Sequence, residues 1–320
     1  MQLQPKATTN APTKNRSLSL RTREKIAGYI FISPWLIGFL FLTFIPLIFS
    51  LYTSFTNYDI TSEMNWVGFK NYITMFTIDP LFWKALYNTT FFVVLSVPLN
   101  TIGALSLAVL LNQKVTGMRI FRTVFYLPHV LSGVAVYLLW MEILNPQTGL
   151  VNVALSWFGI HGPAWFFDPH WAKPGVILMQ LWGVGGGMLL YLGSLQSVPE
   201  SLYEAAELDG AGPWQRFWNI TLPMITPIMF FEIVTGIIGG FQVFQQGYVM
   251  STASGGSPGS GSPVNSLLFY NLEMWNQAFV NFKVGYANAM AWLLFAIVMV
   301  LTWLNFKLSK RWVHYEGGDQ

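Results

Sequence analysis

Six long apolar runs constrain this 320-residue chain more than any other feature of its sequence. Each run holds about 20 residues or more, which is enough to cross roughly 30 Å of hydrocarbon as a helix. The runs are approximately 26–50, 86–110, 120–144, 174–195, 224–250 and 286–306. Several contain proline, which a membrane helix tolerates because neighbouring helices can satisfy the freed carbonyl groups. The sequence therefore predicts an all-α membrane protein with six transmembrane helices.

The composition agrees with this fold class. Hydrophobic residues make up 53% of the chain and charged residues only 10%, whereas about a quarter of the residues in soluble domains are charged. Aromatic residues reach 17%, which fits the belts that line membrane interfaces. There is no cysteine, and this excludes a disulfide framework and thiolate metal sites.

The distribution of Lys and Arg predicts how the chain is oriented. Most of the 17 basic residues fall on one side of the predicted membrane. These are Lys6, Lys14, Arg16, Arg21, Arg23, Lys25, Lys114, Arg119, Arg122, Arg216, Lys307, Lys310 and Arg311. The other side holds Lys70, Lys84, Lys173 and Lys283. The positive-inside rule places both termini in the cytoplasm of a multi-pass protein.

The chain divides into three parts. Residues 1–25 are polar and basic and are predicted to form a disordered cytoplasmic tail. A signal peptide or a nucleic-acid-binding arm is a weaker interpretation of this tail, because the apolar run that follows is too long for a signal peptide. Residues 26–310 form the transmembrane domain, and residues 311–320 form a second cytoplasmic tail.

A polar loop, residues 196–223, separates the fourth and fifth apolar runs. Ser197 and Glu200 have capping-box spacing, with Pro199 in the first turn. Good helix formers follow up to Leu208, and Gly210 supplies the stop. The loop is predicted to hold a short helix on the cytoplasmic side, with small residues that let another surface approach.

This loop carries a specific resemblance. The loop contains the pattern EAA, three residues, G, nine residues, I-x-L-P, with every fixed position present. The residues are Glu204-Ala205-Ala206, Gly210 and Ile220-Thr221-Leu222-Pro223. The pattern resembles the EAA loop of bacterial ABC importer permeases. The resemblance implies the type I permease fold, in a bacterial inner membrane. It also implies a coupling helix that docks on an ATP-hydrolysing partner through Glu204, Ala205, Ala206, Asp209 and Gly210.

Two further segments are similar to sugar-type, maltose-like permeases. Asn65–Tyr72 resembles their F/W-V-G-L-x-N-Y element, with Phe69 in place of the commoner Leu, and is equally explained as an interfacial anchor. Arg311–Gly317 resembles their R-W-V-x-Y-E tail. Between them, residues 251–263 are predicted to be a flexible external linker, longer than the turn found in relatives.

Glycines cluster at Gly183–Gly187 in the fourth run. They do not form a phosphate loop, and the chain has no G-x-x-x-x-G-K-[ST] pattern. Any ATP hydrolysis must therefore come from another polypeptide, and no cofactor is expected on this chain. Within an apolar helix the cluster indicates close helix packing, with an unwound wall beside a ligand as the alternative.

The fifth run is the most polar. Glu232 lies about eight residues in, and such an acid should face a partner or a wet cavity. Gln242 and Gln245 share a helix face if the run is one helix, beside Phe241. Amides and aromatic rings suit a polyol, although these amides could equally join two helices. By analogy with related permeases, the candidate substrate contacts are Trp182, Gly183, Phe241, Gln242 and Gln245.

The chain offers no catalytic or metal-binding pattern. His129, His161 and His170 are scattered without metal-ligand spacing. The expected function is therefore that of a non-enzymatic permease subunit of an ABC importer for sugars or oligosaccharides, working by alternating access. The resemblance implies a second permease, two ATPase subunits, an external solute-binding protein, the sugar and membrane lipid as partners, and no nucleic acid.

Two alternatives stay open. A secondary transporter or channel would show internal repeats and several intramembrane charges, and neither is evident. A glycerol-phosphate importer would need Arg or Lys in its cavity to bind the phosphate. The interiors of the last three apolar runs contain neither residue. A neutral sugar is therefore favoured. Which sugar, which ATPase, the resting conformation and the role of Glu232 are not determined by the sequence.

Overall fold

The computed structural model describes residues 20–61, 63–113, 115–131 and 133–314. Over these ranges the regular structure is helical, apart from one isolated antiparallel bridge between Thr56 and Trp66. Most of the predicted amino-terminal tail and the last six residues lie outside the described ranges. The part of the tail that is described, residues 20–25, begins a helix.

The chain divides into two compact units, residues 1–52 and 53–320. The first contains α1 (Leu20–Phe39), a π-helical turn η1 (Leu40–Phe44) and most of α2 (Ile45–Ser54). These elements run on as a single apolar helix of 35 residues, long enough to cross a membrane, and its most apolar stretch has no buried side chain. Exposed apolar side chains along a whole helix indicate that lipid or another membrane helix covers it.

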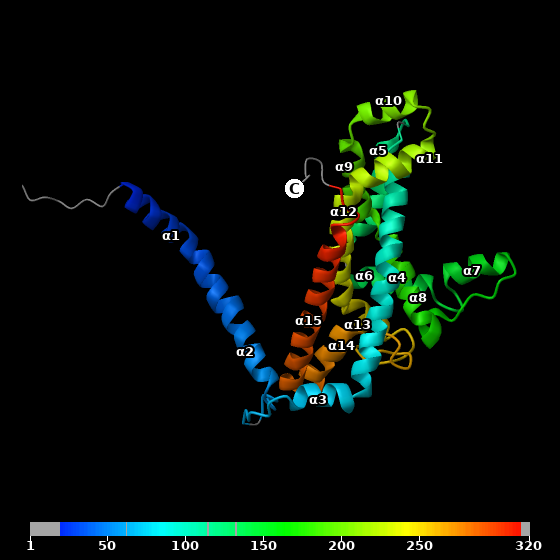
Figure 1. Ribbon diagram of the computed structural model, residues 1–320. Coiled ribbons are helices and arrows are strands. Elements are labelled where there is room, and N and C mark those ends of the chain that lie inside the picture. Colours follow the sequence, from blue (N-terminus) through cyan, green and yellow to red (C-terminus); the bar gives the residue numbers. More distant parts are fainter. Residues whose placement is uncertain (1–19, 62, 114, 132, 315–320) are drawn as a thin grey trace, which may run out of the picture. The chain divides into compact units, whose positions relative to one another are not determined.

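The second unit holds the remaining helices. They are α3 (Lys70–Thr77), α4 (Pro80–Leu111), α5 (Met118–Val130), α6 (Gly133–Ile143), α7 (Leu150–Trp157), η2 (Trp165–Phe167), α8 (Pro169–Trp182), α9 (Gly185–Ser197), α10 (Glu200–Leu208), α11 (Pro213–Arg216), η3 (Phe217–Thr221), α12 (Leu222–Phe241), α13 (Gln245–Met250), α14 (Tyr270–Trp275), η4 (Asn276–Val280) and α15 (Val284–Ser309). Figure 1 shows α10 and α11 at one end of α4 and α3 at the other.

The centre of this unit is α4. Its start is well defined, because the Asp79 side chain accepts hydrogen bonds from the backbone N–H groups of Leu81 (2.9 Å) and Phe82 (3.3 Å), and Pro80 occupies the first helical position. The helix packs against α8, α9, α12 and α14. Small residues such as Ala104 and Ala108, fully or almost fully buried, let α9 approach closely.

Two of the predicted spans are broken. The third consists of α5 and α6, which meet at 102°, and the fourth of α8 and α9, which meet at 46°. The described residues thus hold four unbroken helices long enough to cross a membrane, or up to six if each bent pair is one span. Pro128 and the positive φ of Gly133 (61°) explain the sharper bend.

The fifth span is shorter than the sequence predicts. The helix that was expected to continue to residue 250 ends at Phe241, and α13 begins only at Gln245. Gly239 and Gly240 are poor helix formers, and Phe244 leaves the helical region with φ −140° and ψ −61°. The assumption that Gln242 and Gln245 share one helix face is therefore wrong.

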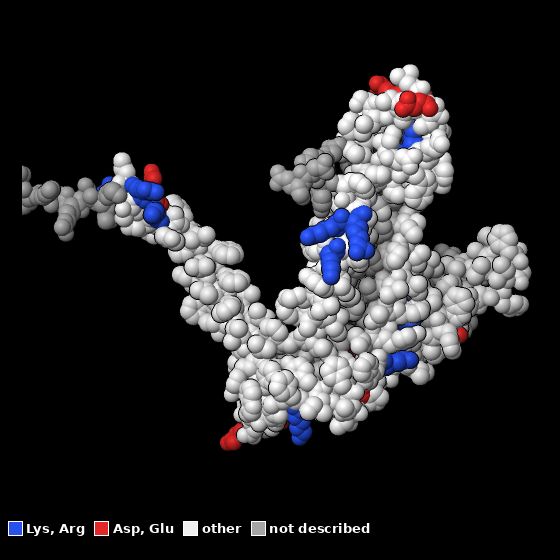
Figure 2. Space-filling view, viewed as in Figure 1, with Lys and Arg blue, Asp and Glu red and all other residues white. Residues whose placement is uncertain are grey.

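Charged side chains gather at the two ends of the second unit. Figure 2 shows acidic side chains over α10 and basic ones over the end of α15, with an uncharged surface along the helices between this end and the opposite one. The exposed side chains in the uncharged part of α15 include Phe295, Met299, Val300 and Trp303. This distribution fits a membrane-spanning bundle with both ends in water.

The carboxyl-terminal segment packs back onto α12. The His314 backbone N–H donates to Thr226 Oγ1 (2.9 Å), and the Trp312 ring lies edge-on to Phe230 at 6.3 Å. Arg311–His314 thus lies against the protein, and the rest of the predicted tail motif falls outside the described residues. The contacts give the described part of this motif a packing role.

A buried amide ties α4 to the segment that directly follows the predicted linker, residues 251–263. Asn88 is fully buried, and its Nδ2 donates to the carbonyl oxygens of Asn265 (2.8 Å) and Leu268 (2.9 Å). Its Oδ1 accepts a hydrogen bond from Lys173 Nζ at 3.0 Å. The Lys173 ammonium also lies over the ring of Phe91, at 5.3 Å from the centroid. Residues 265–268 are therefore packed against α4.

We predict that Asn88→Ala lowers the free energy of unfolding by about 2 kcal/mol, because it strands buried carbonyl groups and a buried ammonium. Thermal unfolding of the detergent-purified protein measures the effect. Thr90→Ala is the matched control, since Thr90 is exposed on the same helix, and should change stability by less than about 0.5 kcal/mol. Equal stability of the two variants would contradict this role for Asn88.

Candidate functional site

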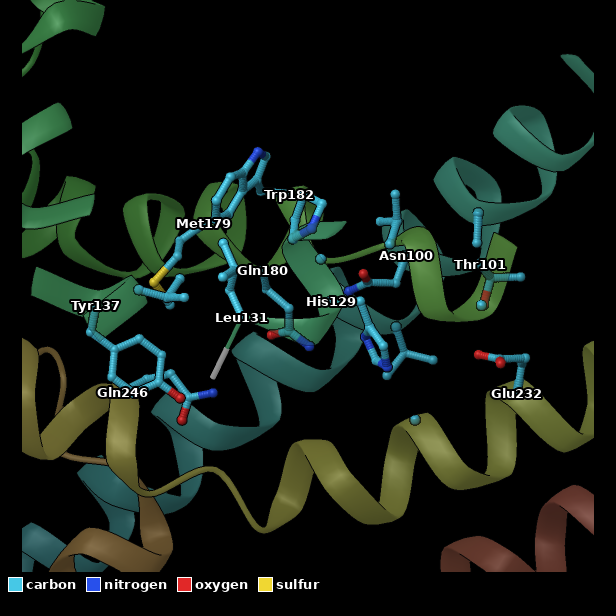
Figure 3. Close-up of a pocket in the computed structure, with 18 of the residues that line it drawn as sticks. Asn100, Thr101, His129, Leu131, Tyr137, Met179, Gln180, Trp182, Glu232 and Gln246 are labelled. Carbon is cyan, nitrogen blue, oxygen red and sulfur yellow. The ribbon is translucent and has the colours of Figure 1, made fainter. Parts of the chain in front are cut away.

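A cavity of about 510 Å³ opens between the helices of the second unit (Figure 3). It has the size of a small-molecule site. Its walls come from α4, α5, α6, α8, α9, α12 and α13. The lining residues are Val97, Asn100, Thr101, Ala104, Pro128, His129, Leu131, Gly133, Val136, Tyr137, Met179, Gln180, Trp182, Gly183, Val184, Gly187, Glu232, Gly236 and Gln246.

Polar groups are spread along the whole cavity. Figure 3 shows Tyr137 and Gln246 towards one end, Gln180 and Trp182 in the middle, and Glu232 with Thr101 towards the other end. Among the described lining residues, the ionisable side chains are His129, Tyr137 and Glu232, and there is no Lys or Arg. The cavity is therefore rich in neutral donors and acceptors and poor in positive charge.

The glycine cluster both packs helices and lines this cavity. A Cβ on Gly185 would collide with the carbonyl oxygen of Phe125, so α5 and α9 touch backbone to backbone. A Cβ on Gly186 would lie 2.5 Å from the His129 ring, and one on Gly187 would lie 3.3 Å from Glu232 Oε2. Three consecutive glycines thus make room for helix α5, an imidazole and a carboxylate.

The structure distributes the sequence-predicted substrate residues over several places. Trp182 and Gly183 line the cavity, with the Trp182 ring edge-on to Trp140 at 6.0 Å. Phe241 is buried and lines a separate apolar cavity of about 490 Å³ between α4, α12 and α15. Gln242 is exposed at the end of α12, and Gln245 begins α13 next to the cavity wall.

Other polar lining residues were not among the sequence candidates. They are Asn100, Thr101, His129, Tyr137, Gln180, Glu232 and Gln246. The sequence does indicate that Glu232 faces a partner or a wet cavity, because an intramembrane acid is costly elsewhere. The other six carry no local signal, since each becomes a cavity residue only through the packing of several helices.

The predicted cytoplasmic helix is α10. It ends where Gly210 adopts φ +80°, the left-handed conformation that glycine provides at helix ends. Its start differs from the prediction, because Ser197 Oγ donates to the Ser194 carbonyl (2.7 Å) and Pro199 occupies the cap position without a side-chain bond. At the next helix, α11, the Gly212 backbone N–H donates to Gln215 Oε1 at 3.0 Å, which is half of a capping box because glycine has no side chain to complete it.

Two contacts hold α10 against the segment that follows it. Arg216 Nη1 lies 3.3 Å from Glu207 Oε2, and the Tyr203 hydroxyl lies 2.9 Å from Thr221 Oγ1. Large apolar side chains remain exposed on this part of the molecule, at Leu202, Leu208, Trp214 and Trp218. Leu208 is 90% exposed, and an apolar patch beside acidic residues is typical of a protein-binding surface.

No group of three or more potential metal ligands (His, Cys, Asp or Glu) occurs in the part of the chain that the structure describes. Asp168 Oδ1 accepts a hydrogen bond from the His170 backbone N–H (2.8 Å) and lies 3.1 Å from the His170 Nδ1 atom. The backbone hydrogen bond first, and the side-chain one second, hold the pKa of Asp168 below its ordinary value. His129 is the one histidine in the cavity lining.

Comparisons with known proteins agree on one class. Residues 70–314 match the family described as binding-protein-dependent transport system inner membrane component. The chain is 41% identical over 97% of its length to the probable ABC transporter permease protein YesP of Bacillus subtilis, covering 98% of that protein. It is 34% identical over 93% of its length to the lactose transport system permease protein LacF of Rhizobium radiobacter, of which it also covers 98%.

A solved structure shares the fold. It is the crystal structure of a bacterial ABC transporter involved in the import of the acidic polysaccharide alginate, and one of its chains superposes with a TM-score of 0.77 at 25% identity. The match covers 91% of this chain and 97% of that one.

We predict that Gly185→Ala lowers stability by about 1–3 kcal/mol, because its methyl group meets the backbone of α5. Gly193→Ala is the matched control on the same helix, where no atom lies within 4 Å of the added methyl. This control should be neutral or stabilising by about 0.5–1 kcal/mol. Thermal unfolding in detergent compares the two, and a Gly185 variant as stable as the control would disprove the close approach of α5 and α9.

Proposed function

The chain belongs to the family of binding-protein-dependent transport system inner membrane components, and from this premise we propose that it is the permease subunit of an ATP-driven importer of sugars or oligosaccharides. It is a multi-pass membrane protein and a transport subunit. One observation carries the proposal: a polar cavity lies among the membrane helices, and its wall helix α9 leads directly to the exposed helix α10.

The chemistry of the cavity supports a saccharide. Asn100, Gln180 and Gln246 offer amides, and the Trp182 and Tyr137 rings offer flat apolar faces. In the described structure Gln180 Oε1 is buried without a hydrogen-bond partner, and a buried acceptor of this kind is stabilised by a donor such as a sugar hydroxyl. The similarity to a lactose permease points the same way.

The proposed pathway takes its substrate contacts from the residues at the helix breaks. Trp182 and Gly183 line the cavity at the α8–α9 break, and Gln246 lines it just after the α12–α13 break. Gln245 precedes Gln246 in α13, while Phe241 and Gln242 stand at the end of α12, outside this cavity. A phosphate ester would find no Lys or Arg in the described lining, which disfavours a glycerol-phosphate importer.

The rest of the importer is proposed from the family and from the surface of α10. The family description names a binding-protein-dependent system, so an external solute-binding protein is the expected donor of the sugar. Of the two ATPase subunits, one would dock on α10 and the exposed apolar side chains around it. A second permease would complete the pathway, with six spans in this chain and both termini in the cytoplasm.

The proposed mechanism is alternating access. Closure of the ATPase pair would push on α10, and the movement would pass along α9 because only Val198 and Pro199 separate the two helices. Since α9 packs on α4, α5 and α12, a displacement of α9 reshapes three walls of the cavity. Glu204, Ala205, Ala206, Asp209 and Gly210 would form the docking surface.

The test of the proposal is purification and reconstitution. The tagged chain, recovered from its native host in mild detergent, should retain a P-loop ATPase and a second permease, identified by mass spectrometry. Liposomes containing this complex should accumulate labelled saccharide when ATP and the solute-binding protein are present. Solute uptake by the isolated chain without ATP would overturn the proposal in favour of a secondary transporter.

We predict that Gly210→Ala reduces ATP-driven uptake severalfold while the protein still inserts. At φ +80° an alanine is strained by about 1–2 kcal/mol, so the end of α10 must shift. Gly212→Ala is the control, since Gly212 has an ordinary φ of −68°. Binding of the purified ATPase and the rate of uptake are both measured, and equal uptake by the two variants would refute the lever role of α10.

We predict that Gln246→Leu raises the KM for saccharide uptake by about fivefold, the equivalent of one hydrogen bond of roughly 1 kcal/mol. Gln242→Leu tests the neighbouring amide, which is exposed and does not line the cavity, and should leave KM unchanged. Initial rates in liposomes give both values. A larger effect at Gln242 would move the substrate site to the end of α12.

A further inference from the structure

A second polar pocket, of about 550 Å³, lies where the end of α4 meets the start of α5 and the end of α9. Its polar lining consists of donor-rich side chains, with no Asp or Glu among the described residues that line it. The side chains that carry the argument are Arg119, Arg122, Asn112, Gln113 and Gln196. Such a lining favours an anion.

Arg122 is already fixed in place. Its Nε and Nη2 atoms donate to the carbonyl oxygen of Leu111 at 3.2 and 2.9 Å, which closes the end of α4 and orients the guanidinium plane. Arg119 lies three residues earlier on α5, so both arginines project from the same side of that helix. Guanidinium groups match the geometry of phosphate oxygens better than ammonium groups do.

The start of α5 adds to the same preference. The helix has 13 residues and begins after Gly117, whose φ of +85° forms the tight turn beside the pocket. The first N–H groups of a helix carry partial positive charge. The arginines, three amides and this helix start therefore converge on one pocket.

The surroundings identify the source of the anion. Beside the arginines, Ile120, Phe121 and Val124 on α5 and Leu110 on α4 are all more than half exposed. The pocket also stands at the last residues of α4, a helix long enough to cross a membrane. A phospholipid presents a phosphate directly above acyl chains, and so meets both the arginines and these apolar side chains. Free phosphate would use only the arginines.

We propose that this pocket binds the phosphate of an anionic phospholipid from the cytoplasmic leaflet. The side of the membrane rests on the proposed orientation, and that leaflet is the anionic one. Because Gln196 is near the end of α9, only four residues before α10 begins, the bound lipid would fasten the α4–α5 turn to the base of the proposed coupling helix.

The test measures lipid retained by the purified chain. The protein is extracted from nanodiscs containing equal phosphatidylglycerol and phosphatidylcholine, and native mass spectrometry counts the lipids that stay bound. The expected result is preferential retention of phosphatidylglycerol, reduced about fivefold in Arg119→Gln. Arg311→Gln is the matched control, an exposed arginine at the end of α15, and should retain as much phosphatidylglycerol as the parent protein.

Two further measurements test whether the guanidinium geometry matters and whether the bound anion is a lipid or free phosphate. Arg122→Lys keeps the positive charge but loses the pair of hydrogen bonds to the Leu111 carbonyl oxygen. This variant should retain an intermediate amount of lipid. Thermal unfolding checks that it is folded. Inorganic phosphate should not displace the lipid. The proposal is overturned if Arg119→Gln retains as much phosphatidylglycerol as the parent, or if inorganic phosphate competes it away. Since retention needs neither ATP nor sugar, the outcome is independent of the transport experiment.

Discussion

The bundle depends on one constraint: a backbone group inside hydrocarbon must be hydrogen-bonded by the protein or by water. A break in a membrane helix meets this rule where it is buried in protein or borders a wet space. The breaks in this chain meet the condition. Leu131 and Gly133 flank the break between α5 and α6, and Gly183 and Val184 form the break between α8 and α9. Gln246 follows the break between α12 and α13. All five residues line the same cavity. Helix breaks and the cavity are therefore one feature of the structure.

The second determinant is the close packing made possible by small residues. Gly185 brings α9 onto the backbone of α5, and Gly187 leaves room for the Glu232 carboxylate and Ala104. Without a strong hydrophobic driving force between helices in lipid, such contacts supply much of the packing energy. The same glycines therefore stabilise the bundle and shape the wall through which α9 could transmit a movement of α10.

Several polar connections between distant residues lie at the end of the bundle away from α10. Asn88 bonds two carbonyl groups and Lys173, the Tyr286 hydroxyl donates to Asp79 Oδ2 at 2.6 Å, and Asn288 donates to Thr53 Oγ1 at 2.6 Å. At the other end, an ion pair that is partly exposed and a pair of hydroxyl groups join α10 to the segment that follows it. The end of the bundle away from α10 is therefore tied together by bonds between residues that are far apart in the sequence.

The sequence by itself determined the membrane class, the positions of the apolar runs and the short helix that stops at Gly210. These depend on composition and on residues a few positions apart, so local patterns suffice. Only the tertiary structure decided where the helices break and which side chains share the cavity. His129 and Glu232 are about a hundred residues apart and meet beside Gly186 and Gly187 only because α5, α9 and α12 pack together. The packing of distant helices has no signature in the local pattern of any one of them.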